Sequence, residues 1–95
     1  MTCMHVYCRF KGEEAAIRMA NDTEYGLAAY FFTRDLSRAF RVAEQLEYGM
    51  VGVNEVALVS ENAPFGGVKQ SGLGREHGSS GILEFVEEKH VCFGL

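Results

Sequence analysis

The sequence is poor in proline, tryptophan and cysteine, and it has no long apolar run. A single proline among 95 residues excludes a proline-rich linker, and eleven glycines without a three-residue period exclude a collagen repeat. No apolar run approaches the roughly 18 residues needed to span a bilayer. The first residues lack the basic and apolar regions of a secretory signal. We therefore expect a cytoplasmic protein without membrane contact.

An excess of positive charge is also missing. The formal net charge is −4 at pH 7, whereas nucleic-acid-binding domains usually carry a basic face, so we expect no nucleic-acid partner. Apolar residues make up 47 % of the chain and charged residues 23 %, which is typical of a soluble globular protein. The length corresponds to a single domain over residues 1–95.

The three cysteines are an odd number without regular spacing, so a disulfide framework is not expected. Cys3, His5 and Cys8 have the side-chain types of zinc ligands, but a structural zinc site needs about four ligands, and we expect no metal site. A catalytic thiol needs a neighbouring base or a helix N-terminus. Cys8 and Cys92 fall in predicted strands, and we assign no catalytic residue to them.

The order of apolar segments predicts three strands separated by two helices. Strands are expected over residues 5–10, 27–32 and 50–53, and the continuous apolar run 27–32 is typical of a strand covered on both faces. The first helix is expected over residues 13–21, with carboxylates in its first turn and Ala16, Ile17 and Ala20 on one face.

The second helix should begin after Asp35, a suitable N-cap, and end before Gly49, a suitable left-handed cap. Its amphipathic stripe consists of Leu36, Ala39, Phe40, Ala43 and Leu46. Because helical crossovers of this length join parallel strands, the predicted fold class is α/β, with a right-handed βαβαβ parallel sheet and helices packed on it.

The remainder of the chain, after Asn54, is rich in glycine and reads as one long loop, which in a compact domain is usually functional. We expect a short helix over residues 75–80. Residues 86–93 are mixed in polarity and predict a terminal strand at a sheet edge or extending away from the body.

The glycine-rich loop offers two candidate features. Gly72, Gly74 and Gly78 could form a phosphate cradle, but that motif requires a buried strand before it, and the residues before Gly72 do not read as one. We therefore assign no cofactor-binding residue. Phe65 lies between the single proline and a glycine pair, where its ring either lines a small-molecule pocket or pins the loop to the core.

Three segments in order, residues 20–29, 49–54 and 63–76, resemble the aldehyde dehydrogenase superfamily. The resemblance covers residues 9–95, and it is to the C-terminal part of the family's chain. Two segments are most similar to the succinate-semialdehyde dehydrogenase branch: P-F-G-G-V-K-Q-S-G-L-G-R-E and the C-terminal K-H-V-C-F-G-L.

The resemblance implies NAD(P)-dependent oxidation of an aldehyde to a carboxylic acid in a full-length relative. The nucleophilic cysteine, the general-base glutamate and most of the cofactor domain would lie upstream of this chain. We therefore expect a C-terminal fragment, a partial domain that binds no cofactor alone and has no dehydrogenase activity by itself.

The resemblance also implies roles for individual residues. Phe65 matches the aromatic side chain that lines the aldehyde tunnel. Val59 occupies the usual position of a serine that holds the distal carboxylate of a semialdehyde, and Ser60 lies next to it. The segment 86–93 matches the strand of the oligomerisation sheet, so we expect a homo-oligomer formed through a sheet edge and this strand.

Two other functions are consistent with the sequence. The chain could be a non-enzymatic interaction module that associates with itself through an exposed sheet edge. It could also be a small-molecule binder that uses Phe65 and the glycine-rich loop.

Overall fold

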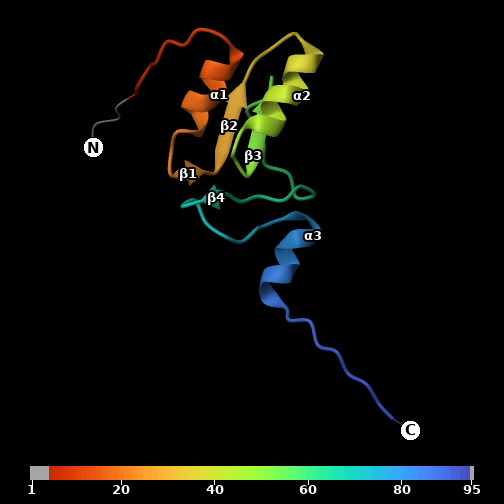
Figure 1. Ribbon diagram of the computed structural model, residues 1–95. Coiled ribbons are helices and arrows are strands. Elements are labelled where there is room, and N and C mark those ends of the chain that lie inside the picture. The colour runs from red at the N-terminus through yellow and green to blue at the C-terminus, as the bar shows by residue number, and fades with distance from the viewer. Residues whose placement is uncertain (1–4, 95) are drawn as a thin grey trace.

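The computed structural model describes residues 5–94. In chain order the elements are α1 (Glu13–Asn21), β1 (Tyr25–Gly26), β2 (Ala28–Phe31), α2 (Leu36–Gln45), β3 (Met50–Val53), β4 (Val68–Lys69), α3 (Gly78–Gly81) and the 3-10 helix η1 (Ile82–Phe85). The helices α1 and α2 lie beside β2 and β3, and α3 lies below them (Figure 1). Both terminal segments extend away from this body (Figure 1).

The unit β2–α2–β3 is the parallel crossover that the sequence predicts. The strands β2 and β3 pair in parallel, with Ala28 opposite Met50 and Phe31 opposite Val53. The helix α2 begins where expected, because the Asp35 carboxylate accepts a hydrogen bond of 2.9 Å from the Arg38 backbone N–H. This bond satisfies one of the free donors at the helix start.

The core is thin and lies where α1 and α2 meet the strand pair. Its buried apolar side chains are Ile17 of α1, Val42 of α2 and Met50 of β3. The predicted apolar face of α1 is confirmed. The predicted stripe of α2 is wrong at Leu36 and Phe40, which are exposed, because the helix turns Val42 toward the core instead.

A charged clamp joins the two helices at their solvent side. The Glu13 carboxylate accepts hydrogen bonds from Arg38 at 2.9 Å and from Arg41 at 3.0 and 3.1 Å. These bonds, that from Arg41 first, lower the pKa of Glu13 below its ordinary value. The clamp fixes the start of α1 against the middle of α2.

A second, very short sheet pairs β1 with β4 in antiparallel register, with Tyr25 opposite Lys69 and Gly26 opposite Val68. It brings the glycine-rich part of the chain back to the residues that follow α1. This pairing was not predicted, because two-residue strands carry no periodic signal in the sequence.

The predicted five-element βαβαβ unit is not formed. Residues 5–10 and 86–93 have no strand pairing, although their composition favours strands. A strand exists only with a hydrogen-bonded partner, and propensity alone does not supply one. The short helix predicted over residues 75–80 begins later, at Gly78, and continues as η1.

The chain leaves much of its surface open, including large apolar side chains such as Tyr7, Leu73 and Phe85. It exposes 8345 Å², whereas a folded monomer of this mass exposes about 5,400 Å². Its radius of gyration is 18.1 Å, against about 12 Å for a compact domain of this length.

Within residues 5–94, none of the helices combines the length and the apolar character needed to cross a membrane.

Candidate functional site

The candidate site is the glycine-rich loop, residues 54–77, together with the residues on which it rests. The loop starts at Asn54, whose backbone is left-handed with φ 56°. The Asn54 side chain accepts a hydrogen bond from the Thr33 N–H and donates one to the Thr33 carbonyl, both 2.8 Å long. These bonds tie the beginning of the loop to the segment after β2.

Phe65 is held by its backbone, and the residue is half-buried. Its N–H donates to the Glu76 carbonyl at 2.8 Å, and the Glu76 N–H donates back at 2.7 Å. The ring centroid lies 6.1 Å from that of His77. Phe65, Leu27 and Phe85 contribute to the lining of a hollow of about 410 Å³. The structure thus places Phe65 at a hollow, with its backbone held by Glu76, and its role at a small-molecule pocket stays a prediction.

Val59 and Ser60 lie away from this hollow. Val59 is 67 % exposed, and neither residue contributes to the lining. The Ser60 carbonyl accepts a hydrogen bond of 3.2 Å from the Ala63 N–H. The Ser60 hydroxyl oxygen accepts one of 3.4 Å from the Asn62 N–H. The structure does not bring Val59 or Ser60 together with Phe65.

A carboxylate organises the chain between Asn54 and Val59. Glu55 accepts hydrogen bonds from the backbone N–H groups of Ala57 at 2.8 Å and Val56 at 2.7 Å. These two bonds lower the pKa of Glu55 below its ordinary value. A charged side chain therefore holds the backbone of this segment, and sequence reasoning did not identify it.

The loop packs on the core through glycine backbone. A Cβ atom on Gly49 would lie 1.9 Å from the Gly66 carbonyl oxygen, a distance that no real side chain can adopt. Gly49 has no positive φ, so the predicted left-handed cap is wrong. Glycine is needed there because the backbone of the loop passes directly against it.

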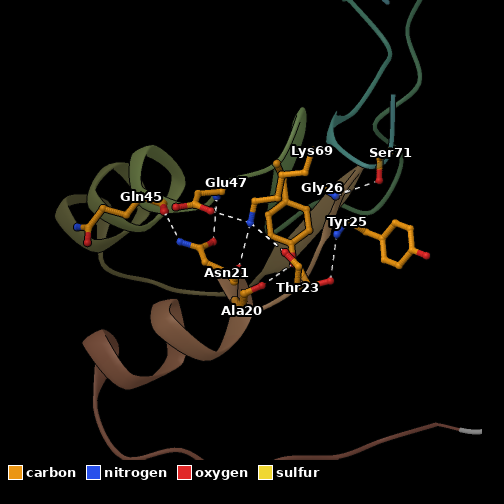
Figure 2. A network of polar contacts seen from close by, with 10 residues as sticks. Ala20, Asn21, Thr23, Tyr25, Gly26, Gln45, Glu47, Lys69 and Ser71 are labelled. Atoms are coloured by element: carbon orange, nitrogen blue, oxygen red, sulfur yellow. Dashed lines mark hydrogen bonds and ion pairs between the residues drawn. The ribbon is translucent and has the colours of Figure 1, made fainter. Parts of the chain in front are cut away.

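Two cationic side chains hold the loop in place, and sequence reasoning did not single them out. Arg75 donates to the carbonyl oxygens of Gly67 at 2.7 Å and Gly74 at 2.9 Å. Lys69 binds the Asn21 and Thr23 carbonyl oxygens and the Glu47 carboxylate, as Figure 2 shows. No sequence signal could have found these contacts, since their acceptors are mostly backbone carbonyls, which every residue carries.

The geometry disfavours a phosphate cradle at Gly72, Gly74 and Gly78. The helix that follows, α3, has four residues, and its short length leaves little helix dipole to attract an anion. A Cβ atom on Gly74 would lie 2.9 Å from a Glu84 carboxylate oxygen. A negative group therefore occupies the space where a phosphate would bind.

The other candidate ligands are dispersed. Cys8 and Cys92 are free and exposed, and Cys3 lies outside the described residues. Among residues 5–94, the side chains of histidine, cysteine, aspartate and glutamate nowhere gather in a group of three suited to a metal ion.

Comparison with known proteins gives a single consistent result. Residues 4–91 match the sequence profile of the aldehyde dehydrogenase family. The chain is 60 % identical over 86 residues to a glutarate-semialdehyde dehydrogenase of Pseudomonas aeruginosa, covering 90 % of this chain and 18 % of that protein. It is 60 % identical over 87 residues to an NADP+ succinate-semialdehyde dehydrogenase of Escherichia coli, covering 92 % of this chain and 18 % of that enzyme.

The fold is shared with a solved relative. A crystal structure described as an Escherichia coli NADP-dependent enzyme superposes with a TM-score of 0.88 at 59 % identity. The superposition covers 93 % of this chain and 18 % of that one. The chain thus spans less than a fifth of the length of the relatives it matches.

Proposed function

The chain belongs to the aldehyde dehydrogenase family, and from this membership we propose that it forms part of the aldehyde-site wall of an NAD(P)-dependent semialdehyde dehydrogenase. The family predicted from the sequence is confirmed. That the chain corresponds to the C-terminal part of the family stays a prediction, as does a cytoplasmic location.

The observation that carries the proposal is the placement of Phe65. Its backbone is bonded on both sides to Glu76, while the residue is half-buried beside a hollow of about 410 Å³. A ring held in this way presents a fixed apolar surface to a small molecule. By its match to the family motif, this surface would contact the aldehyde substrate.

The proposal includes inactivity of the chain by itself. Oxidation of an aldehyde requires a nucleophile, a base and the coenzyme in one site. Between residues 5 and 94, the free thiols are Cys8 and Cys92, which are exposed in segments without regular structure. We propose that the remaining four-fifths of a family member supplies these groups, together with the NAD or NADP site.

The proposal is tested in a chimera. The matched 87-residue segment of the Escherichia coli enzyme is replaced by this chain, and oxidation of succinic and glutaric semialdehydes is followed by NADPH formation. We expect an active chimera, in which Phe65→Leu raises the aldehyde KM several-fold because apolar contact with the substrate is lost. Phe40→Leu is the matched control, since Phe40 lies on α2, outside the hollow. Equal KM values for the two variants would refute the proposal.

The family resemblance assigns Val59 to the position that would hold the distal carboxylate of a semialdehyde, at the end of the substrate away from the hollow beside Phe65. A serine at this position would give a semialdehyde carboxylate a hydrogen-bond donor that valine lacks. In the same chimera we expect Val59→Ser to lower the KM for succinic semialdehyde and Ser60→Ala to leave it unchanged. The opposite pattern would assign the carboxylate contact to Ser60, and no effect of either would place the distal carboxylate elsewhere.

A second candidate function, self-association, is favoured by the open surface. The chain exposes roughly 2,900 Å² more than a folded monomer of its mass, and a stable interface buries about 800 Å² on each partner. Residues 86–93 are extended and expose Val86, Val91 and Phe93. We propose that they gain a strand partner in a second copy, and that residues 5–10 become a strand when a neighbour covers them.

Sedimentation velocity distinguishes these alternatives. A defined oligomer of the 95-residue chain that dissociates on Val91→Asp would support the interaction module. A monomer, or a broad distribution of aggregates unaffected by that substitution, would exclude it and leave the aldehyde-site wall as the proposal.

A further inference from the structure

Lys69 combines a strained backbone with a fully engaged side chain. Its φ is 54°, in the left-handed region that is unfavourable for residues other than glycine. Its Nζ lies 2.6 Å from the Glu47 carboxylate and donates to the carbonyl oxygens of Asn21 at 3.0 Å and Thr23 at 3.2 Å (Figure 2). Such strain persists where the surroundings over-determine the conformation.

The three acceptors come from the ends of both long helices. Asn21 is the last residue of α1, Thr23 precedes β1, and Glu47 lies two residues after α2. The Asn21 side chain extends the cluster by bonding the Gln45 carbonyl at 2.8 Å and the Glu47 N–H at 2.9 Å (Figure 2). Carbonyl groups at a helix C-terminus carry partial negative charge and favour a cation.

The lysine therefore connects the glycine-rich loop to the helix ends at one point. The neighbours of Lys69 in the chain also contact Gly26. Val68 pairs with Gly26 in the short sheet, and the Ser71 hydroxyl accepts a hydrogen bond of 2.9 Å from the Gly26 N–H. In the N-terminal direction from Lys69, the chain passes Gly66, which packs against Gly49, and then reaches Phe65. Three residues, Gly66, Gly67 and Val68, separate Lys69 from Phe65.

We propose that Lys69 is a positioning residue that sets the location of Phe65 through the backbone of the glycine-rich loop. Its significance for substrate binding rests on the proposed function, in which Phe65 faces the aldehyde. Lys69 does not touch the hollow beside Phe65, so its effect is transmitted by the chain between them.

Amide hydrogen exchange on the full 95-residue chain tests the positioning. Lys69→Met keeps the aliphatic stem and the strained backbone but removes the ammonium group. We expect protection to fall at least about tenfold at the Gln70, Gly26 and Phe65 amides. The Asn54 amide, bonded to the Phe31 carbonyl at the end of the β2–β3 ladder, should keep its protection.

The matched control is Lys11→Met, since Lys11 is exposed before α1, and it should change none of these amides. Lys69→Arg keeps a cation within reach of the same acceptors and should retain most of the protection. Unchanged exchange at Phe65 would overturn the proposal. A uniform fall at every amide, Asn54 included, would also overturn it, because Lys69 would then support overall stability without positioning the loop.

Kinetics in the chimera test the consequence for substrate. Lys69→Met should raise the KM for the semialdehyde and leave the KM for NADP+ unchanged, and Glu47→Gln should have a smaller effect in the same direction. A lower fraction of folded enzyme would reduce the apparent kcat but would not raise one KM while leaving the other unchanged. An unchanged aldehyde KM would overturn the link to substrate. The exchange result does not depend on what Phe65 faces, so failure of the positioning and failure of the proposed function are distinguishable.

Discussion

The helical core, made of α1, β2, α2 and β3, and the glycine-rich loop are stabilised by different interactions. In the core, apolar side chains from three elements are buried, namely Ile17, Val42 and Met50. The helix ends and the helix pair are fixed by carboxylates, Asp35 at the start of α2 and Glu13 between α1 and α2. The core therefore depends on side-chain volume and on charge.

The glycine-rich loop is held mainly through its backbone. Phe65 and Glu76 exchange backbone hydrogen bonds, Arg75 and Lys69 bind carbonyl oxygens, and Gly49 and Gly66 approach without side chains. Removal of apolar volume should damage the core most, whereas an added methyl group at the right glycine should damage the loop most. The two regions can thus be perturbed separately.

The largest effect should follow from removing volume in the core. Ile17 is 8 % exposed, and Ile17→Ala should cost about 2–5 kcal/mol of the free energy of unfolding, measured in urea. Met19→Ala on the same helix is the control, since Met19 is 45 % exposed and should cost well under about 1 kcal/mol. Similar costs for the two would mean that α1 does not contribute its predicted face to a core.

An added methyl group at Gly49 should act on the loop. Gly49→Ala places a Cβ against the Gly66 carbonyl, a backbone atom that cannot turn aside, and should cost about 1–3 kcal/mol. Exchange should accelerate at the Phe65 and Glu76 amides and stay slow at Asn54. Gly94→Ala, which meets no atom within 4 Å, is the control. Loss of protection at Asn54 as well would show that the two regions unfold together.

The helical core could be predicted from the sequence because its signals are local. Each element is marked by residues within or next to it. Asp35 caps α2, carboxylates stand in the first turn of α1, and short apolar segments form β2 and β3. The segments 5–10 and 86–93 have no strand pairing within residues 5–94, because pairing is a long-range event that composition does not specify. Their composition is that of a strand, but the part of the chain that the structure describes places no strand beside them.

The candidate site was predicted in part. Phe65 was identified from its proline and glycine neighbours, and the structure places it at a hollow. Lys69, Arg75 and Glu55 were missed, since they bind backbone groups, and such acceptors are present at every position of any sequence. Gly49 was identified for a wrong reason, because the approach of Gly66 depends on the folded chain.

A smaller effect is expected at the start of α2, and it isolates the capping hydrogen bond of Asp35. Asp35→Ala removes the acceptor for the Arg38 N–H and should lower the Tm and the helix signal in circular dichroism. Asp35→Asn keeps a capping oxygen and should restore most of the loss. Equal Tm values for the alanine variant and the unmodified chain would show that packing of Val42 alone holds the helix.

The smallest effect concerns the clamp between α1 and α2, and it depends on pH. Hydrogen bonds from Arg41 and Arg38 lower the pKa of Glu13 below its ordinary 4.5, so folding favours its ionised form. This contribution is fully present above pH 4.5 and is lost as the pH falls through the lowered pKa of the folded state. Added salt should weaken it, since the side chains are partly exposed.

Glu13→Gln should therefore reduce the Tm at pH 7, and this effect should shrink as the pH is lowered from 4.5 through the lowered pKa of the folded state, when Tm is followed by circular dichroism. Glu14→Gln is the control, because Glu14 is 94 % exposed and lies 3.8 Å from Arg18, so its substitution should change the Tm little at either pH. A Glu13→Gln effect that persists unchanged in acid would mean that the clamp acts through packing. Exchange at Phe65 should not follow the titration of Glu13, because its partner is a backbone carbonyl, and this independence separates the loop from the core.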